Sequence, residues 1–154
     1  MQGVCFAAGA PRGRRAGAAI AAACATAALA APSAALGFVT SRVENGKLIA
    51  RSDGSADIVK VSCGADLRVK VNGLDPEAGA APCAAIRRVR VLGRGGADTI
   101  NVTRVGPRNG FTHPGLRRRH RVRAFGGSGP DRISGSRLSD LLAGGGSHDA
   151  LRGR

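Results

Sequence analysis

The sequence predicts an all-β fold built from short strands stacked in thin layers, and three observations lead to this prediction. Apolar and polar residues alternate over much of the chain after residue 36, as in half-buried strands. The chain has 24 glycines, 3% aromatic residues and neither Trp nor Tyr, so its core has to be built from small aliphatic side chains, which suit thin stacked layers. Finally, the C-terminal segment repeats with a period of nine residues.

Residues 1–35 are expected to form a helical secretory signal peptide rather than part of the fold. A basic region containing Arg12, Arg14 and Arg15 precedes the small apolar run from Ala16 to Ala31. Small residues at 28–30 and 33–35 then offer two cleavage sites, which completes the three parts of such a signal. The run is short and rich in Ala, so we expect no transmembrane span in the mature chain and a secreted, extracellular protein.

Residues 36–92 are expected to form a strand-rich β region. Asn-Gly pairs at 45–46 and 72–73 indicate turns between strands. The alternating segments, which continue into the region that follows, are Val59–Cys63, Leu67–Val71, Val89–Val91 and Ile100–Val102. Export would leave Cys63 and Cys83 as a pair in an oxidising compartment, so we expect them to form a disulfide.

Residues 93–154 contain glycine-rich nonapeptides. Three consecutive units, 126–134, 135–143 and 144–152, each begin with Gly, have Asp at the sixth place and have Ile or Leu at the eighth. The upstream unit 93–101 matches with Asp98 at its sixth place, and 52–60 is a fainter echo. Glycines in the first half of such a unit allow a tight turn, whereas the second half forms a short strand with an inward aliphatic residue.

This pattern, G-G-x-G-x-D-x-U-x, resembles the hemolysin-type calcium-binding repeats, or RTX repeats, in an exported bacterial form. The resemblance implies a right-handed parallel β-roll or β-helix stack in which two nonapeptides make one coil and calcium lies between turns. Asp131 and Asp149 would share one ion, whereas Asp140 would face the other side. The metal site implied in this way comprises Gly126, Gly127, Gly129, Asp131, Asp140, Gly144, Gly146 and Asp149, with Asp98 from the upstream unit.

The sequence leaves two functions open. The first is a secreted calcium-binding β-roll protein in which calcium has a structural role. The second is a non-catalytic basic surface or matrix module that binds acidic polysaccharide or another cell-surface polymer, with vestigial calcium sites. The formal net charge of +14 and the run Arg117–Arg123 are compatible with a polyanion, but we expect the arginines of that run to lie on the solvated face of a loop that enters a strand.

No catalytic residue is predicted, because no nucleophile, base and orienting group occur together in a recognisable motif. The protein is therefore not expected to be an enzyme. Nucleic acid is not expected as a partner either, because the basic run has no interleaved aromatic residues and the protein is expected to be exported.

Overall fold

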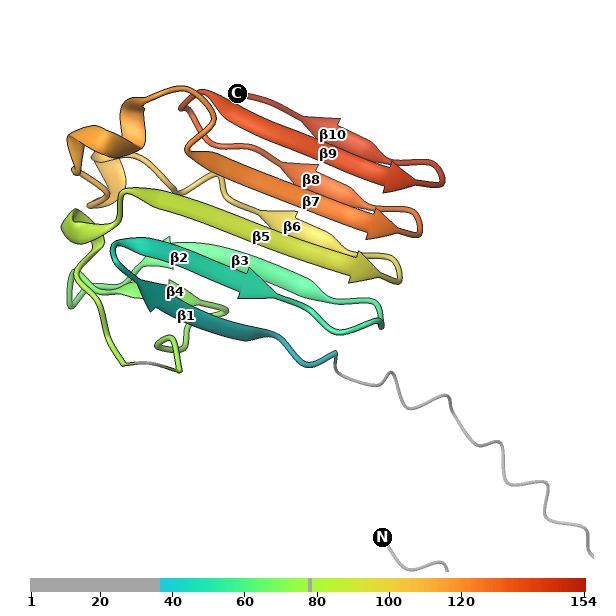
Figure 1. The fold of residues 1–154 in the computed structure, drawn as a ribbon, viewed down its shortest axis with the longest axis horizontal. Coiled ribbons are helices and arrows are strands. Elements are labelled where there is room, and N and C mark those ends of the chain that lie inside the picture. Colours follow the sequence, from blue (N-terminus) through green and yellow to red (C-terminus); the bar gives the residue numbers. More distant parts are fainter. Residues whose placement is uncertain (1–36, 78) are drawn as a thin grey trace, which may run out of the picture. The chain divides into compact units, whose positions relative to one another are not determined.

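The computed structural model describes residues 37–77 and 79–154, which form two five-stranded β-sheets (Figure 1). The first sheet has the order β1-β2-β5-β7-β9 and the second has the order β10-β8-β6-β3-β4. The strands are β1 (Thr40–Glu44), β2 (Lys47–Arg51), β3 (Ile58–Cys63), β4 (Val69–Val71), β5 (Arg88–Gly95), β6 (Thr99–Asn101), β7 (Val122–Ser128), β8 (Arg132–Ser134), β9 (Asp140–Gly146) and β10 (Ala150–Arg152).

The chain passes repeatedly from the first sheet to the second and back. We call each pair of successive strands with the turn that joins them a rung; the rungs are β2–β3, β5–β6, β7–β8 and β9–β10. Neighbouring rungs pair in parallel in both sheets, whereas β1 and β4 add to them in antiparallel fashion. The two sheets are therefore mixed.

The last two rungs are in register with a shift of 18 residues. Gly127 pairs with Gly145 in the first sheet, and Arg132 pairs with Ala150 in the second. Two nonapeptides thus span one complete passage through both sheets, which brings equivalent places of the units 126–134 and 144–152 side by side.

The strands of both sheets end at two opposite sides, where connections join them; we call these sides the turn edge and the loop edge (Figure 1). At the turn edge, on the right of the figure, short segments at 52–57, 96–98, 129–131 and 147–149 join the strands of each rung. At the loop edge, on the left, longer or less regular segments at 64–87, 102–121 and 135–139 lead to the next rung. The β1–β2 turn also lies at the loop edge.

The core lies between the sheets and consists mainly of Val, Ile and Leu. The alternation seen in the sequence explains it, because every second strand residue points inward. In β5, Val89 and Val91 are fully buried and alternate with the exposed Arg88 and Arg90. In the second sheet, Ile100 and Ile133 are fully buried at the centres of β6 and β8. Phe111 and Leu116 close the core below the loop edge.

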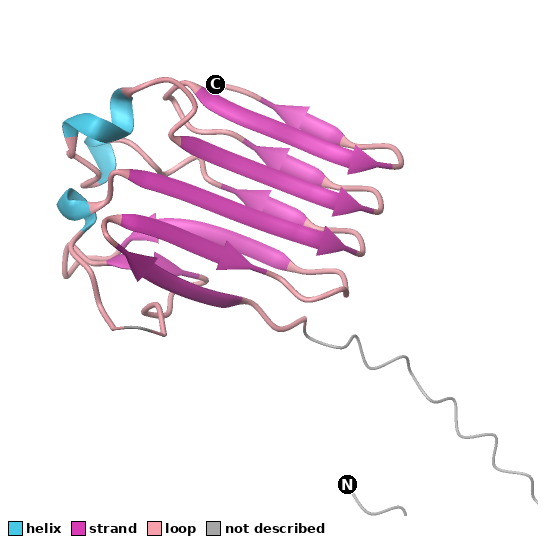
Figure 2. Ribbon diagram, in the orientation of Figure 1, coloured by secondary structure: helices cyan, strands magenta, loops and turns pink. Residues whose placement is uncertain are grey.

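The all-β prediction is confirmed. Helical structure among the described residues is limited to the short 3₁₀ helices η1 (Cys83–Ala85), η2 (Pro107–Asn109) and η3 (Pro114–Arg117), which all lie at the loop edge (Figure 2). No helix in the described part of the chain is long and apolar enough to cross a membrane. The predicted signal peptide, 1–35, lies outside the described residues.

Local predictions agree with the structure in most places. Asn45 and Gly46 both have positive φ and form the two-residue turn of the β1–β2 hairpin. Leu67, in contrast, was expected in a strand, but it has φ 57°, is 68% exposed and lies in the turn before β4. The division expected between residues 92 and 93 falls inside β5, so the sheets continue across it.

Candidate functional site: an aspartate ladder at the turn edge

One aspartate from each rung lies at the turn edge, and the four form a ladder across the rungs. The backbone N–H of Asp57 donates to Oδ1 of Asp98 over 2.9 Å, and that of Asp98 donates to Oδ1 of Asp131 over 2.9 Å. The N–H of Asp131 donates to Oδ1 of Asp149 over 3.0 Å. Each of these three carboxylates therefore satisfies a backbone donor of the preceding rung.

The first three aspartates of the ladder each have one buried carboxylate oxygen without a hydrogen bond. Asp57, Asp98 and Asp131 are only 4%, 1% and 3% exposed, and their Oδ2 atoms are buried without a hydrogen bond. Burying an unpaired carboxylate oxygen costs free energy, which a bound cation or proton would offset. The Oδ2 atoms of Asp57, Asp98 and Asp131 are thus candidate ligands for a cation.

The first glycine of each unit makes room for the carboxylate at its sixth place. A Cβ at Gly126 would collide with Oδ2 of Asp131, and one at Gly144 would collide with Oδ2 of Asp149. Gly93 has the same relation to Asp98. Each carboxylate folds back over its own unit, which explains why Gly and Asp recur five residues apart.

Backbone carbonyl oxygens of the next rung approach the same space. A Cβ at Gly93 would also collide with the carbonyl oxygen of Gly126, and one at Gly126 would lie 2.6 Å from the carbonyl oxygen of Gly144. Carboxylate and carbonyl oxygens are the ligands that Ca²⁺ prefers. No group of three or more His, Cys, Asp or Glu side chains gathers as a metal site among the described residues, so a cation here would depend on carbonyl oxygens as well.

Burial also changes the acidity of the ladder. Desolvation raises the pKa of Asp98 to about 6, opposed by the hydrogen bond from Asp57 and assisted by the negative charges of Asp131 and Asp57. Desolvation likewise raises the pKa of Asp57, with a further contribution from Asp53. The ladder therefore concentrates negative charge in a poorly solvated place, which favours a bound cation.

The turns themselves require left-handed backbone at two places of the unit. At the fourth place, Gly96, Gly129 and Ser147 have φ values of 87°, 115° and 82°. At the second place, Arg94 has φ 77°, where the other two units have glycine. Ser147 and Arg94 thus keep the turn geometry although their side chains make it costly.

The predicted metal residues separate into two groups. Gly126, Gly127 and Gly129 lie with Asp98, Asp131 and Asp149 at the turn edge, together with Gly144 and Gly146. Asp140 lies at the opposite edge, at the start of β9, where its carboxylate accepts hydrogen bonds from Ser136 N (2.5 Å) and Ser136 Oγ (2.6 Å). Both of its oxygens are used locally.

Asp57 belongs to the ladder although it was not among the predicted site residues. The signal was present in the sequence, because 52–60 has Asp57 and Val59 at the sixth and eighth places. The unit begins with Ser52 instead of Gly, and the hydroxyl of Ser52 donates to the carbonyl oxygen of Gly93. Gly37 supplies the space that Asp57 needs, from outside the unit.

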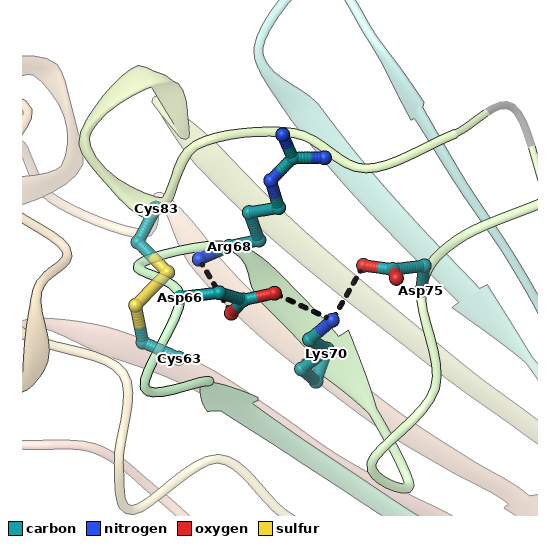
Figure 3. Close-up of a disulfide and its surroundings, with 6 residues drawn as sticks. All are labelled: Cys63, Asp66, Arg68, Lys70, Asp75 and Cys83. Carbon is teal, nitrogen blue, oxygen red and sulfur yellow. Dashed lines mark hydrogen bonds and ion pairs between the residues drawn. A yellow bond between two sulfur atoms is a disulfide. The ribbon is translucent and has the colours of Figure 1, made fainter.

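Cys63 and Cys83, the predicted pair, form a disulfide at the loop edge, with 1.99 Å between the sulfur atoms (Figure 3). Next to it, Lys70 Nζ lies 2.9 Å from Asp66 Oδ2 and 2.8 Å from Asp75 Oδ1. The hydrogen bond from Lys70 lowers the pKa of Asp66. The disulfide and these ion pairs link β3, β4 and the segment that follows β4. They lie at the loop edge, whereas the ladder lies at the turn edge.

Compared with protein-family models, with curated proteins and with solved structures, the chain gives no significant match. The fold and the ladder geometry therefore provide the basis for a functional proposal.

Proposed function

We propose that this chain is a secreted, non-catalytic calcium-binding protein with a β-roll fold, in which calcium clamps neighbouring rungs together. The observation that carries this proposal is the row of buried, unpartnered Oδ2 atoms of Asp57, Asp98 and Asp131 at the turn edge. The alternation of successive strands between two sheets, with parallel pairing of the rungs, supports the β-roll.

The residues fit a hard cation that takes oxygen ligands. Asp98 with the carbonyl of Gly126, and Asp131 with the carbonyl of Gly144, would hold it between rungs. A bound divalent ion would neutralise carboxylates that are otherwise crowded and desolvated. Its role would be structural, because ions bound only by the folded state stabilise that state by mass action.

Export, which is part of the proposal, agrees with a calcium-binding role. Calcium is plentiful outside the cell, and the disulfide between Cys63 and Cys83 is typical of proteins that fold in an oxidising compartment. The exported protein is expected to begin near residue 31 or residue 36, after one of the two small-residue cleavage sites. N-terminal sequencing of the secreted protein checks this; retention of Met1 would contradict it.

Thermal unfolding with and without calcium tests the proposal. At a calcium concentration about one hundred times Kd, the folded state gains about 3 kcal/mol, a rise in Tm on the order of 10 °C for a domain of this size. Asp131→Asn is expected to abolish most of this rise. Asp140→Asn is the matched control and is expected to leave the rise intact, because Asp140 lies at the loop edge.

An unchanged Tm of the wild type in millimolar calcium would overturn the calcium clamp. The ladder would then be a purely structural hydrogen-bond array, and the basic surface module would become the better account of the protein. Magnesium at the same concentration separates a specific effect from general screening, since Mg²⁺ gives up its water ligands reluctantly.

A further inference from the structure

The loop edge contains two pockets lined largely by cations. The first has a volume of about 650 Å³ and lies between the β1–β2 turn, the start of β5 and η3. Its cationic lining consists of Lys47, Arg87, Arg88, Arg118 and Arg121. The second, of about 820 Å³, lies beside η2 and the β8–β9 connection, and its lining includes Arg104, Arg108, Arg117 and Arg137.

The first pocket is assembled from three segments that are distant in the sequence. The backbone N–H groups of Arg87 and Arg88 donate to the carbonyl oxygen of Gly46 over 2.7 and 3.2 Å. A guanidinium N–H of Arg87 donates to the carbonyl oxygen of Asn45 over 2.9 Å. Leu116, which is 1% exposed, anchors η3 in the core and thereby fixes the segment that leads to Arg118.

The charges of these pockets are not compensated within the described part of the chain. The ion pairs found there are Arg42–Glu44, Lys70–Asp66 and Lys70–Asp75, and none involves a cation lining a pocket. Glu44 also lines the first pocket, but its Oε1 lies 2.6 Å from Nε of Arg42. No acidic side chain lines the second pocket.

The two pockets adjoin at the end of η3. Arg117 lines the second pocket and the next residue, Arg118, lines the first. We call the cations that line the two pockets the cationic track; they are more numerous than a single small anion can use. Guanidinium groups suit such a partner because each can donate two parallel hydrogen bonds to a sulfate or carboxylate.

We propose that this track binds an acidic polysaccharide, a chain with sulfate or carboxylate groups at regular intervals. Among the described residues, neither pocket is lined by Phe, Tyr or Trp, and His113 in the first pocket has the one aromatic ring in the two linings, so the track lacks the row of aromatic side chains on which successive nucleic-acid bases stack. The track lies at the loop edge, opposite the aspartate ladder, and no residue of the ladder lines either pocket. Binding is therefore independent of calcium.

Fluorescence anisotropy with a labelled heparin-derived oligosaccharide tests this inference on the mature chain. The double variant Arg118→Gln/Arg121→Gln is expected to weaken binding about tenfold and to reduce its salt dependence, because fewer counterions are released. The control Arg90→Gln/Arg123→Gln removes the same charge from exposed residues paired on β5 and β7, and is expected to change binding less than about threefold. Unchanged far-UV circular dichroism melts show that both variants fold.

Equal binding by the two double variants would overturn the assignment to the track. Tighter binding of a single-stranded oligonucleotide of equal charge would overturn the choice of polysaccharide. Complete competition by inorganic sulfate at constant ionic strength would show that a single small anion occupies the site, and would overturn the claim that the partner is an extended chain. Binding that is unchanged by a calcium chelator supports the independence of the two edges. If the wild-type protein does not bind the oligosaccharide but still responds to calcium, the track is refuted and the calcium proposal stands.

Discussion

At the turn edge the chain passes between the sheets in segments that repeat from rung to rung, whereas at the loop edge the connections differ in length and sequence. The turn edge places an Asp of one rung against the backbone of the next, as in the contact between Asp98 and Asp131. The loop edge instead contains the 3₁₀ helices, the disulfide and most of the uncompensated cations described above. The repeated contacts between rungs therefore constrain the residues of the turn edge, whereas the connections at the loop edge can differ in length and sequence.

The difference follows from how each edge satisfies its backbone groups. At the turn edge, carboxylates accept from the N–H groups of the neighbouring rung, so each rung needs the same residues at the same places. At the loop edge, hydrogen bonds form mostly within a connection, such as those from Ser136 to Asp140. Substitutions that add a side chain where neighbouring rungs approach closely should accordingly be more costly at the turn edge than at open places of the loop edge.

Gly127→Ala is expected to have the largest effect. Gly127 has φ 118°, and a Cβ there would collide with the carbonyl group of Arg94 in the neighbouring rung. We expect a loss of more than about 3 kcal/mol in the free energy of unfolding, because both strain and overpacking oppose the methyl group. Urea unfolding followed by circular dichroism measures it.

Gly106→Ala is the matched control at the loop edge. A Cβ at Gly106 would have no neighbour within 4 Å. Gly106 is buried, but the added methyl group would enter open space, so we expect a loss below about 1 kcal/mol. Equal losses in the two variants would contradict the contrast between the edges.

Removal of the disulfide is expected to be the next largest effect. Cys63 and Cys83 are 20 residues apart, so the double variant Cys63→Ala/Cys83→Ala should lose about 3 kcal/mol by the loop-entropy model. The calcium-dependent rise in Tm should persist, because the ladder lies at the other edge. Thermal melts of the double variant with and without calcium check both statements, and a lost calcium response would show that the edges are coupled.

Asp98→Asn is expected to stabilise the calcium-free protein at neutral pH. The pKa of Asp98 is raised from 3.8 to about 6 in the folded state, so its contribution to stability is fully present below about pH 4 and is lost as pH rises through 6. Asn can still accept from the N–H of Asp57, and it removes the buried charge. The net gain at pH 7 should be about 2 kcal/mol, less than the roughly 3 kcal/mol that the full shift represents.

Urea unfolding of wild type and Asp98→Asn at pH 4 and pH 7, in calcium-free buffer, provides the measurement. The gain should appear at pH 7 and shrink at pH 4. Asp66→Asn serves as a control at the loop edge, where the hydrogen bond from Lys70 lowers the pKa, so its effect should have the opposite sign and be small. A gain of equal size at both pH values would exclude buried charge as the cause.

Sequence reasoning succeeded where a residue's role is local or periodic. The alternation around Val89 and Val91 predicted a strand, and Asn45-Gly46 predicted a hairpin turn. The nonapeptides predicted that Asp131 and Asp149 lie side by side, whereas Asp57, in the incomplete unit 52–60, was not assigned to the site. Such signals are readable because the same few residues recur at fixed distances.

The cationic pockets could not be predicted in the same way. Arg118 and Arg121 belong to a basic run that is visible in the sequence, but Lys47 and Arg88 reach the same pocket only through the pairing of β2 with β5. Leu67 was misplaced for a different reason, since alternation alone does not reveal the turn before β4. That turn is local: the N–H of Leu67 donates to the carbonyl oxygen of Gly64, and the N–H of Gly64 donates to that of Arg68.

Ser147→Gly is expected to have the smallest effect and to be stabilising. Ser147 has φ 82° at the fourth place of its unit, where Gly129 occupies the equivalent position one rung earlier. Glycine removes the strain of a side chain in left-handed backbone, which costs about 1 kcal/mol, although it also gives the unfolded chain more freedom. We therefore expect a net gain of about 0.5 kcal/mol and no loss of the calcium response.

Ser128→Gly tests the same change where the backbone is not left-handed. Ser128 is the last residue of β7 and is paired with Gly146, so glycine there brings the entropic cost and removes the long, exposed hydrogen bond from Ser128 Oγ to the carbonyl oxygen of Arg94. A loss of about 0.5 kcal/mol is expected, opposite in sign to the change at Ser147. If both variants lost stability equally, the turn geometry at the fourth place would not be the source of strain, and the glycines of the repeat would be explained by the close approach of neighbouring rungs alone.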